Sequence, residues 1–172
     1  HGLIVLPAIA WLVSGKNPLQ FLRAVSQPMV TALFTSSSAA TLPLSMQTAQ
    51  EKLGVDQARS AFVLPLGATA NMDGTALFEG IAAVFLAYMF GIDLGTTGVI
   101  AIFLVAMLSS VGAPGIPSGS MAGMQMVLLA VGIPLEAIGL LLLIERPLDT
   151  FRTAVNVEGD LVGCLVAKRF AS

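Results

Sequence analysis

The stretch ATANMDGTALFEG, residues 68–80, places two acids and an amide inside a run of mostly small and apolar residues. The three side chains are Asn71, Asp73 and Glu79. Carboxylate and amide oxygens suit a hard cation that prefers oxygen ligands. Polar groups of this kind are costly in apolar surroundings unless they have partners. The stretch is therefore a candidate binding site rather than part of a core.

A second polar set lies in ERPLDTFRTAVNVEGD, residues 145–160. At about 100° per residue, one helix face about 100° wide holds Glu145, Asp149, Arg152, Thr153, Asn156 and Asp160. The flanking stretches IGLLLLI and LVGCLVA are typical of membrane segments. Charges in such a segment cost several kcal/mol unless they pair or face water. We therefore expect the stripe to line a cavity rather than a solvated surface.

Arg152 and Asp149 together offer two opposite charges one helical turn apart. A guanidinium can hold a carboxylate with two parallel hydrogen bonds, and a carboxylate can accept from an ammonium group. The pair could bind both ends of a zwitterion. The alternative is that the two side chains neutralise each other as a structural ion pair.

The composition indicates a membrane protein. Of the 172 residues, 56% are hydrophobic and only 10% are charged, against roughly 25% charged in soluble domains. The net charge of -2 and the lack of a basic run argue against a nucleic-acid partner. Cys164, alone, provides neither a disulfide framework nor a Cys/His zinc spacing. Because His1 opens directly into an apolar run, we expect a piece of a longer chain rather than a signal peptide.

The apolar segments are short and interrupted. VIAIFLVAMLSSV, residues 99–111, is shorter than the roughly 20 residues of a spanning helix. It runs into GAPGIPSGS, where Pro and Gly end any helix. Irregular backbone at membrane depth is tolerated only where protein buries it or where it lines a wet cavity. Broken segments therefore indicate a site.

A weak internal repeat supports this interpretation. SSAATLPLSM (37–46) and SSVGAPGIPSGSM (109–121) share serines, small residues and an aliphatic-Pro pair. Each is followed by an Asn-aliphatic-acid-Gly motif, NMDG at 71–74 and NVEG at 156–159. Paired interruptions in two halves of a sequence are typical of a transporter's binding site.

Four motifs in order, TSSSAATLP, GATANMDGTALFEG, SVGAPGIPSGS and LDTFRTAVNVEGD, resemble the glutamate transporter family, the dicarboxylate/amino acid:cation symporters. The resemblance covers nearly all of this chain but only the C-terminal part of the family's chain. It implies an all-α membrane protein with discontinuous transmembrane helices and two re-entrant helical hairpins. The implied parts are the last helices before the first hairpin (1–28) and a transport domain (29–172) made of hairpin 1 (29–50), an interrupted helix (60–92), hairpin 2 (97–131) and a polar helix (132–169).

The resemblance also implies residue roles. Arg152 would bind the substrate's side-chain carboxylate and Asp149 its amino group. The full implied substrate set is Ser36, Ser37, Ser38, Thr75, Ile116, Ser118, Ser120, Asp149, Arg152, Thr153 and Asn156. Within this set, 116–120 would be a hairpin tip that closes over the substrate.

Sodium ions are the implied co-transported cations. One implied site comprises Asp160, Asn156, Asn71 and Gly67, and a second comprises Thr69 with the backbone of Ser110, Val111 and Ala113. A third, near Asp73 and Asn71, needs ligands from an earlier helix. Gly74 is expected to break the helix, so that Asn71 and Asp73 need not share a face.

Glu79 matches the position where proton-coupled family members carry an acid, so it is the candidate proton carrier. Its alternative role is a structural Glu satisfied by a nearby hydroxyl. A second arginine that the family carries near the site is missing, because its two usual positions are Thr35 and Thr150. Arg146 is the candidate substitute.

The resemblance thus implies sodium-coupled symport of glutamate or aspartate, with Glu79 as the candidate for proton coupling, by a multi-pass homotrimer in the cell or inner membrane. C4-dicarboxylate symport and a passive anion channel are the alternatives. An intramembrane hydrolase is disfavoured, because the one histidine, His1, gives the serines no credible base.

Overall fold

The computed structural model describes residues 1–170 and contains only helices in that range. This confirms the all-α prediction. The elements are α1 (Val5–Ser14), α2 (Pro18–Thr35), α3 (Ser38–Glu51), α4 (Gln57–Ala70), α5 (Asp73–Met89), α6 (Gly95–Ser110), α7 (Ser120–Ala130), the short 3₁₀ helix η1 (Leu135–Ala137) and α8 (Ile138–Phe170).

Local sequence signals set the helix ends on one side of the molecule. α1 is capped at its C-terminus by Gly15, whose φ of 71° lies in the left-handed region that glycine adopts without strain. Asn17 and Pro18 start α2, with the Asn17 side chain accepting from the Leu19 backbone. Asp56 caps α4 by accepting from the Arg59 N–H, and this bond together with the Arg59 guanidinium lowers the pKa of Asp56.

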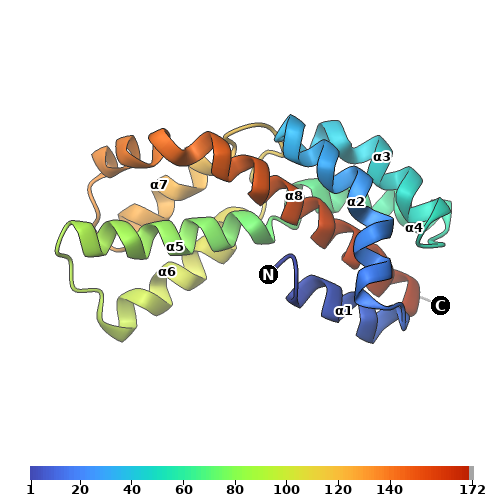
Figure 1. Cartoon of the computed structure of the whole chain (residues 1–172). Helices are drawn as coiled ribbons and strands as arrows, with labels where there is room; N and C mark the ends of the chain where they lie inside the picture. Colours follow the sequence, from blue (N-terminus) through green and yellow to red (C-terminus); the bar gives the residue numbers. More distant parts are fainter. Residues whose placement is uncertain (171–172) are drawn as a thin grey trace.

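α8 runs the length of the molecule, and the other helices form two groups along it (Figure 1). The helices α1 to α4 surround its C-terminal half, whereas α5 and α7 contact it and α6 packs on α5 and α7. Each group has its own apolar cluster, one on each half of α8. The polar stripe, residues 145–160, occupies the middle of α8 (Ile138–Phe170), so the fold places it at the centre of the molecule.

Two pairs of consecutive helices form hairpins. α2 contacts α3 across a break at Ser36 and Ser37, and α6 contacts α7 across the loop 111–119. The predicted boundary between residues 28 and 29 falls inside α2, which continues through Pro28. The interrupted helix predicted at 60–92 corresponds to α4 and α5, and the segment predicted at 132–169 contains η1 and α8.

The break between α4 and α5 lies at Asn71 and Met72, whose ψ angles of 72° and 56° are not helical. The prediction that Gly74 breaks this helix is therefore wrong. Gly74 belongs to the first turn of α5. Its lack of a side chain serves a close approach to α8 instead, as described below.

Much of the outer surface is apolar. Among the described residues, the stretch Gln57–Met89, which comprises α4, the break and α5, is long and apolar enough to cross a membrane, and α1, α6 and α7 are shorter apolar helices. Large apolar side chains such as Phe34, Tyr88 and Leu143 are exposed. A surface of this kind suits contact with lipid or with further protein.

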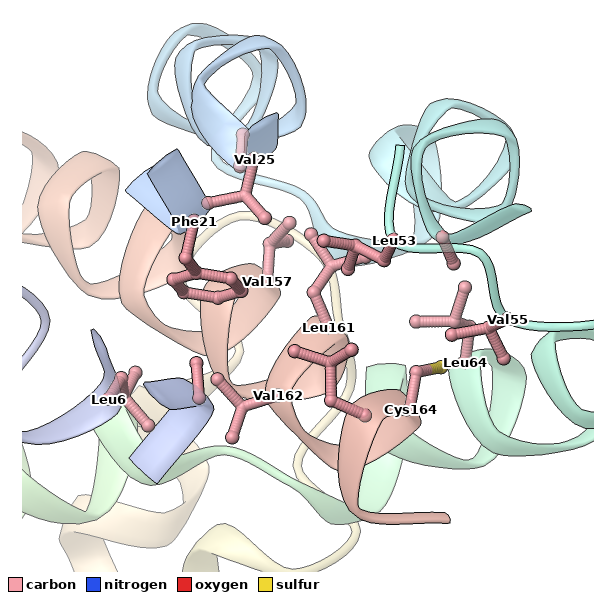
Figure 2. Close-up of a cluster of buried hydrophobic side chains, with 14 of the residues drawn as sticks. Leu6, Phe21, Val25, Leu53, Val55, Leu64, Val157, Leu161, Val162 and Cys164 are labelled. Carbon is pink, nitrogen blue, oxygen red and sulfur yellow. The ribbon is translucent and has the colours of Figure 1, made fainter. Parts of the chain in front are cut away.

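Leu161 on α8 is fully buried between α2 and α4, in the cluster that Figure 2 shows with Phe21, Val25 and Leu64 around it. We expect Leu161→Ala to destabilise the fold by about 2–5 kcal/mol, because it leaves a cavity. Leu143→Ala, an exposed position on the same helix, is the control and should change stability little. Thermal unfolding of the full-length protein in detergent measures both, and equal melting temperatures would contradict the packing role.

Candidate functional site

The two hairpin tips touch each other at the centre of the molecule. The Ser37 hydroxyl donates to the Gly115 carbonyl at 2.8 Å, and the Ala39 N–H donates to the same oxygen at 3.2 Å. The Gly112 N–H donates to the Thr69 carbonyl at 2.8 Å, at the end of α4. The two serine-rich segments of the internal repeat therefore meet, although more than 70 residues separate them in the sequence.

The two Asn-containing motifs also meet. Asn156 of α8 accepts through Oδ1 from the backbone N–H groups of Gly74 (2.8 Å) and Thr75 (3.3 Å). Its amide nitrogen lies 3.2 Å from the Thr75 hydroxyl, within hydrogen-bonding distance. Asn156 thus satisfies N–H groups at the start of α5 that have no partner within the helix. The interruption between α4 and α5 is held against α8 by this side chain.

Three glycines permit this close packing. A Cβ at Gly74 would lie 2.6 Å from the Arg152 carbonyl oxygen, and one at Gly67 would lie 2.5 Å from Asp160 Oδ1. A Cβ at Gly159 would lie 2.9 Å from Asn71 Nδ2 and from Asp73 Oδ2. Real Cβ atoms do not approach other atoms so closely, so the polar side chains could not hold these positions with a larger residue.

A small cavity of about 10 Å³ lies where these elements converge. Its volume is that of about one water molecule. It is lined by Ser36, Ser38, Met72, Thr75, Ala113, Pro114, Gly115, Ile116, Gly119, Ser120, Asp149, Arg152, Thr153 and Asn156. Most of the substrate residues predicted from sequence are therefore brought together. Of the rest, Ser37 bonds to the opposite tip and Ser118 bonds to acids of α8.

Three helices point their N-termini at this cavity. Ser38 is the first residue of α3, Thr75 lies in the first turn of α5, and Ser120 is the first residue of α7; all three line the cavity. The N-terminal end of a helix carries a partial positive charge and unpaired N–H groups, which favour anions. The cavity is therefore suited to a negatively charged group. Sequence reasoning missed this convergence, because it depends on how distant helices are placed.

Arg152 is buried and paired with two acids. Its Nη2 donates to Asp149 Oδ1, and to Glu145 Oε1 at 3.1 Å. The guanidinium also lies over the Phe78 ring, 4.4 Å from its centre. Nη1 has no hydrogen-bond partner among the described residues. Arg152 and Asp149 therefore form an ion pair in this structure, which was the alternative to binding a zwitterion. The Nη1 group of Arg152 remains without a described partner and could bind a ligand.

Ser118 ties the tip of the second hairpin to the same acids. Its backbone N–H donates to Asp149 Oδ2 and its hydroxyl donates to Glu145 Oε2, both at 2.9 Å. Ser118 has a φ of 61°, in the left-handed region that non-glycine residues rarely adopt. Because the cavity holds only about one water molecule, a larger ligand can enter only if some of the elements around it move.

Glu145 is a site residue that sequence reasoning placed on the polar stripe without giving it a role. Its side chain is buried and bonds to both Arg152 and Ser118. Arg146, the proposed substitute for the missing second arginine, is exposed and does not line the cavity. That proposal is wrong, since successive residues on a helix point about 100° apart.

The predicted cation residues fall on two sides of the break between α4 and α5. Asn71 donates to Asp160 Oδ1 at 3.1 Å, beside Gly67. Thr69 lies beside the second tip, through its carbonyl bond to Gly112. Asp73 lies against Gly159 as Asn71 does, since a Cβ there would be 2.9 Å from a side-chain atom of each, and Asp73 Oδ2 also bonds to His1 at 2.8 Å. In residues 1–170, no group of three or more His, Cys, Asp or Glu side chains is placed to hold a metal ion, so a cation here would also need amide, hydroxyl and carbonyl oxygens.

Two further acids are buried outside the cavity. Glu79 accepts from the Ser109 hydroxyl through Oε2, while its Oε1 abuts Gly123 and has no partner among the described residues. If Glu79 had only a structural role, a nearby hydroxyl would satisfy its carboxyl group. Ser109 does so for Oε2 but not for Oε1. Glu158 is fully buried on α8, and neither of its oxygens has a partner within residues 1–170. Sequence reasoning included Glu158 only in the repeat motif.

Several known proteins are similar to this chain. A family model described as "Sodium:dicarboxylate symporter family" matches residues 1–170. Excitatory amino acid transporter 3 of Mus musculus is 45% identical over 99% of this chain and 33% of its own length. Excitatory amino acid transporter 2 of Homo sapiens is 48% identical over 95% of this chain and 28% of its own length. An excitatory amino acid transporter of Caenorhabditis elegans is 43% identical over 99% of this chain and 34% of its own length.

The chain spans about a third of the length of these relatives. The family match, in contrast, covers all but two of its residues. The order of the four motifs had predicted this family, and the match confirms it. The chain belongs to the sodium:dicarboxylate symporter family.

Proposed function

We propose that this chain is the substrate-binding part of a sodium-coupled symporter for acidic amino acids. The observation that carries the proposal is the cavity that joins Arg152 and Asp149 to three helix N-termini. Such a site offers a cation for one carboxylate, N–H groups for a second and an acid for an ammonium group. Glutamate and aspartate carry these three groups. The relatives named excitatory amino acid transporters support the same substrate class.

Binding would exchange the internal ion pairs for ligand contacts. The ligand's side-chain carboxylate would take the free Nη1 of Arg152 and compete with Asp149 and Glu145 for the rest of the guanidinium. Asp149 would then accept from the ligand's ammonium group. The main-chain carboxylate would bind Asn156, Thr75 and the backbone of 36–38. Asp149 and Glu145 neutralise Arg152 before the ligand binds, and the ligand's carboxylate neutralises it afterwards. The buried guanidinium is therefore never left without an anionic partner.

We propose that sodium is co-transported rather than held as a resident ion. Asp160, Asn71 and Asn156 supply side-chain oxygens near the break between α4 and α5. Thr69 and the backbone of Ser110, Val111 and Ala113 form the second candidate set, and Asp73 contributes to a third. Sodium bound there would stabilise the interrupted backbone that holds the substrate site, which couples the two ligands.

We propose that the hairpins α2–α3 and α6–α7 are re-entrant, with their tips meeting inside the bilayer. In this arrangement the loop 111–119 is the gate, because Ser118 links it directly to Asp149 and Glu145. Residues 29–172 would form a mobile transport domain, following the end of a preceding helical part in 1–28. The complete protein would be a multi-pass homotrimer of the cell or inner membrane.

The alternatives differ in one chemical feature each. A C4-dicarboxylate has no ammonium group, so it leaves Asp149 without a ligand partner. A passive anion channel would conduct without sodium-driven accumulation. A hydrolase is disfavoured because His1, the one histidine of the sequence, bonds to Asp73 and not to a serine.

The test is binding to the purified full-length protein with and without sodium, comparing L-aspartate, L-glutamate, succinate and L-serine. We expect the two acidic amino acids to bind, and binding to disappear without sodium. Equal binding of succinate would refute the role of Asp149 as the ammonium partner. Binding that ignores sodium would refute the cation sites.

We also propose that Glu79 carries a proton during transport. The carboxyl is buried between α5, α6 and α7, with one oxygen unpaired among the described residues. Glu79→Gln keeps the shape but removes the ionisable group, so we expect transport to lose most of its pH dependence between about pH 5 and 8. Uptake against external pH measures this, with exposed Glu136→Gln as the control. A pH profile unchanged from the parent protein would assign Glu79 a structural role.

A further inference from the structure

Four basic side chains gather at the end of the molecule where α1, α3 and α8 finish. They are Lys16, Lys52, Lys168 and Arg169. This is the end where the C-terminus and the connections α1–α2 and α3–α4 lie (Figure 1). The proposed transport cycle uses none of these side chains. They are about 30 residues or more apart in sequence, apart from the neighbours Lys168 and Arg169, and only the fold makes them a cluster.

Three of the four line a hollow of about 300 Å³. Its basic lining consists of Lys16, Lys168 and Arg169, and its apolar lining includes Val13, Leu53 and Leu165. The hollow therefore has cations beside an aliphatic wall. A group that fills it must combine negative charge with hydrocarbon.

Backbone carbonyls hold these cations in place. Lys16 Nζ donates to the Lys52 carbonyl at 2.9 Å, and Lys168 Nζ donates to the Leu53 carbonyl at 3.3 Å. Arg169 Nη1 donates to the Leu12 and Val13 carbonyls, both at 2.8 Å. Each ammonium has three N–H donors and the guanidinium has five. Donors thus remain for a ligand after the carbonyl contacts are counted.

Within the part of the chain that the structure describes, these charges have no carboxylate partner. Among residues 1–170, no acid lies within salt-bridge distance of Lys16, Lys168 or Arg169. A simpler explanation is that the three side chains only cap helix C-termini. Capping accounts for all of these carbonyl bonds. It accounts for neither the hollow nor the three positive charges around it, which no acid of residues 1–170 pairs with.

Two exposed aromatic side chains lie at the same end of the molecule. Trp11, on the last turn of α1 next to Leu12, is 53% exposed, and Phe170 is 74% exposed beside the Arg169 guanidinium. Trp is enriched where a membrane protein crosses from hydrocarbon to water. An exposed Trp at this end is therefore compatible with a position near lipid headgroups.

We propose that this hollow binds the phosphate headgroup of an anionic phospholipid, with Lys16, Lys168 and Arg169 on the phosphate and Val13, Leu53 and Leu165 against the start of the acyl chains. Basic clusters next to membrane helices attract anionic lipids, with about a fivefold gain in affinity for each Lys or Arg. A bound lipid would tie together the ends of α1, α3 and α8. It would do so without touching the substrate cavity.

Trp11 supplies the reporter for a test with the full-length protein. The protein is placed in phosphatidylcholine nanodiscs that contain either brominated phosphatidylglycerol or brominated phosphatidylcholine, and the signal absent from Trp11→Phe is assigned to Trp11. We expect brominated phosphatidylglycerol to quench Trp11 at a lower lipid fraction. Equal quenching by the two lipids would overturn the proposal.

Charge variants separate lipid binding from capping. Gln can still donate to a carbonyl but carries no charge, so Lys168→Gln and Lys16→Gln should each raise the phosphatidylglycerol fraction for half-maximal quenching about fivefold. Lys168→Arg should keep the parent value, as should Arg23→Gln, which removes an exposed charge outside the hollow. If Lys168→Gln lowers the melting temperature and leaves quenching unchanged, the lysine only caps.

The hollow could also bind a soluble phosphate instead of a lipid headgroup, and a competition experiment separates the two. Inorganic phosphate or glycerol 3-phosphate is added to the brominated phosphatidylglycerol nanodiscs at rising concentration. We expect neither to relieve the quenching at millimolar concentration, because neither has acyl chains for the aliphatic wall. Full relief by inorganic phosphate would overturn the lipid assignment. This test involves no substrate or sodium, so its outcome is independent of the proposed transport function.

Discussion

Arg152→Cys is expected to weaken binding of L-glutamate and L-aspartate by about 100-fold or more and to abolish their uptake. Two charge-assisted hydrogen bonds to a carboxylate are worth about 3 kcal/mol together, which corresponds to about a 100-fold change. The variant also leaves Glu145 and Asp149 without their cation in a buried site. Their negative charge would then repel an acidic ligand.

The same change should alter specificity as well as affinity. A smaller, neutral side chain leaves space where the guanidinium lay against the Phe78 ring, while Asp149 can still accept from an ammonium group. We therefore expect Arg152→Cys to admit neutral amino acids such as L-serine. Sodium-dependent uptake of labelled L-glutamate and L-serine into proteoliposomes measures both effects.

Arg146→Cys is the matched control, because it removes an arginine from an exposed position of the same helix. It should leave uptake of both amino acids at the parent level. Unchanged glutamate uptake in Arg152→Cys would refute the carboxylate-binding role. A loss of uptake in Arg146→Cys as large as that in Arg152→Cys would show that the effect is not specific to the cavity.

Gly67→Ala is expected to lower the affinity for sodium by about 10–100-fold, the range seen when groups that orient metal ligands are altered. The added Cβ would lie 2.5 Å from Asp160 Oδ1 and 3.0 Å from its Cγ. Asp160 would have to shift, which breaks its hydrogen bond with Asn71. The sodium concentration dependence of L-aspartate binding measures the change.

Gly80→Ala provides the control for this glycine. A Cβ at Gly80 meets nothing within 4 Å, and Ala is favoured over Gly inside a helix by about 0.5–1 kcal/mol. Gly80→Ala should therefore keep the parent sodium dependence and lose no stability. If Gly67→Ala also keeps the parent sodium dependence, Asp160 and Gly67 do not form a cation site.

The sequence by itself determined the family and the helical class, and it predicted most of the polar residues that line the central cavity. Composition and broken apolar runs indicate helices in a membrane, and four ordered motifs predict the family that the comparison confirms. The periodicity of residues 145–160 also predicted one polar face on α8. All six residues of that face are buried. These features were predictable because they depend on local spacing along one helix.

Tertiary structure alone decided how the site is assembled. Gly74 is a packing contact rather than a helix break, Glu145 shares Arg152 with Asp149, and the basic hollow joins the ends of three helices. None of these follows from local spacing, because each depends on the distance between side chains or backbone groups from different turns or helices. The sequence fixes which groups are present, whereas the packing of helices along α8 decides which of them touch.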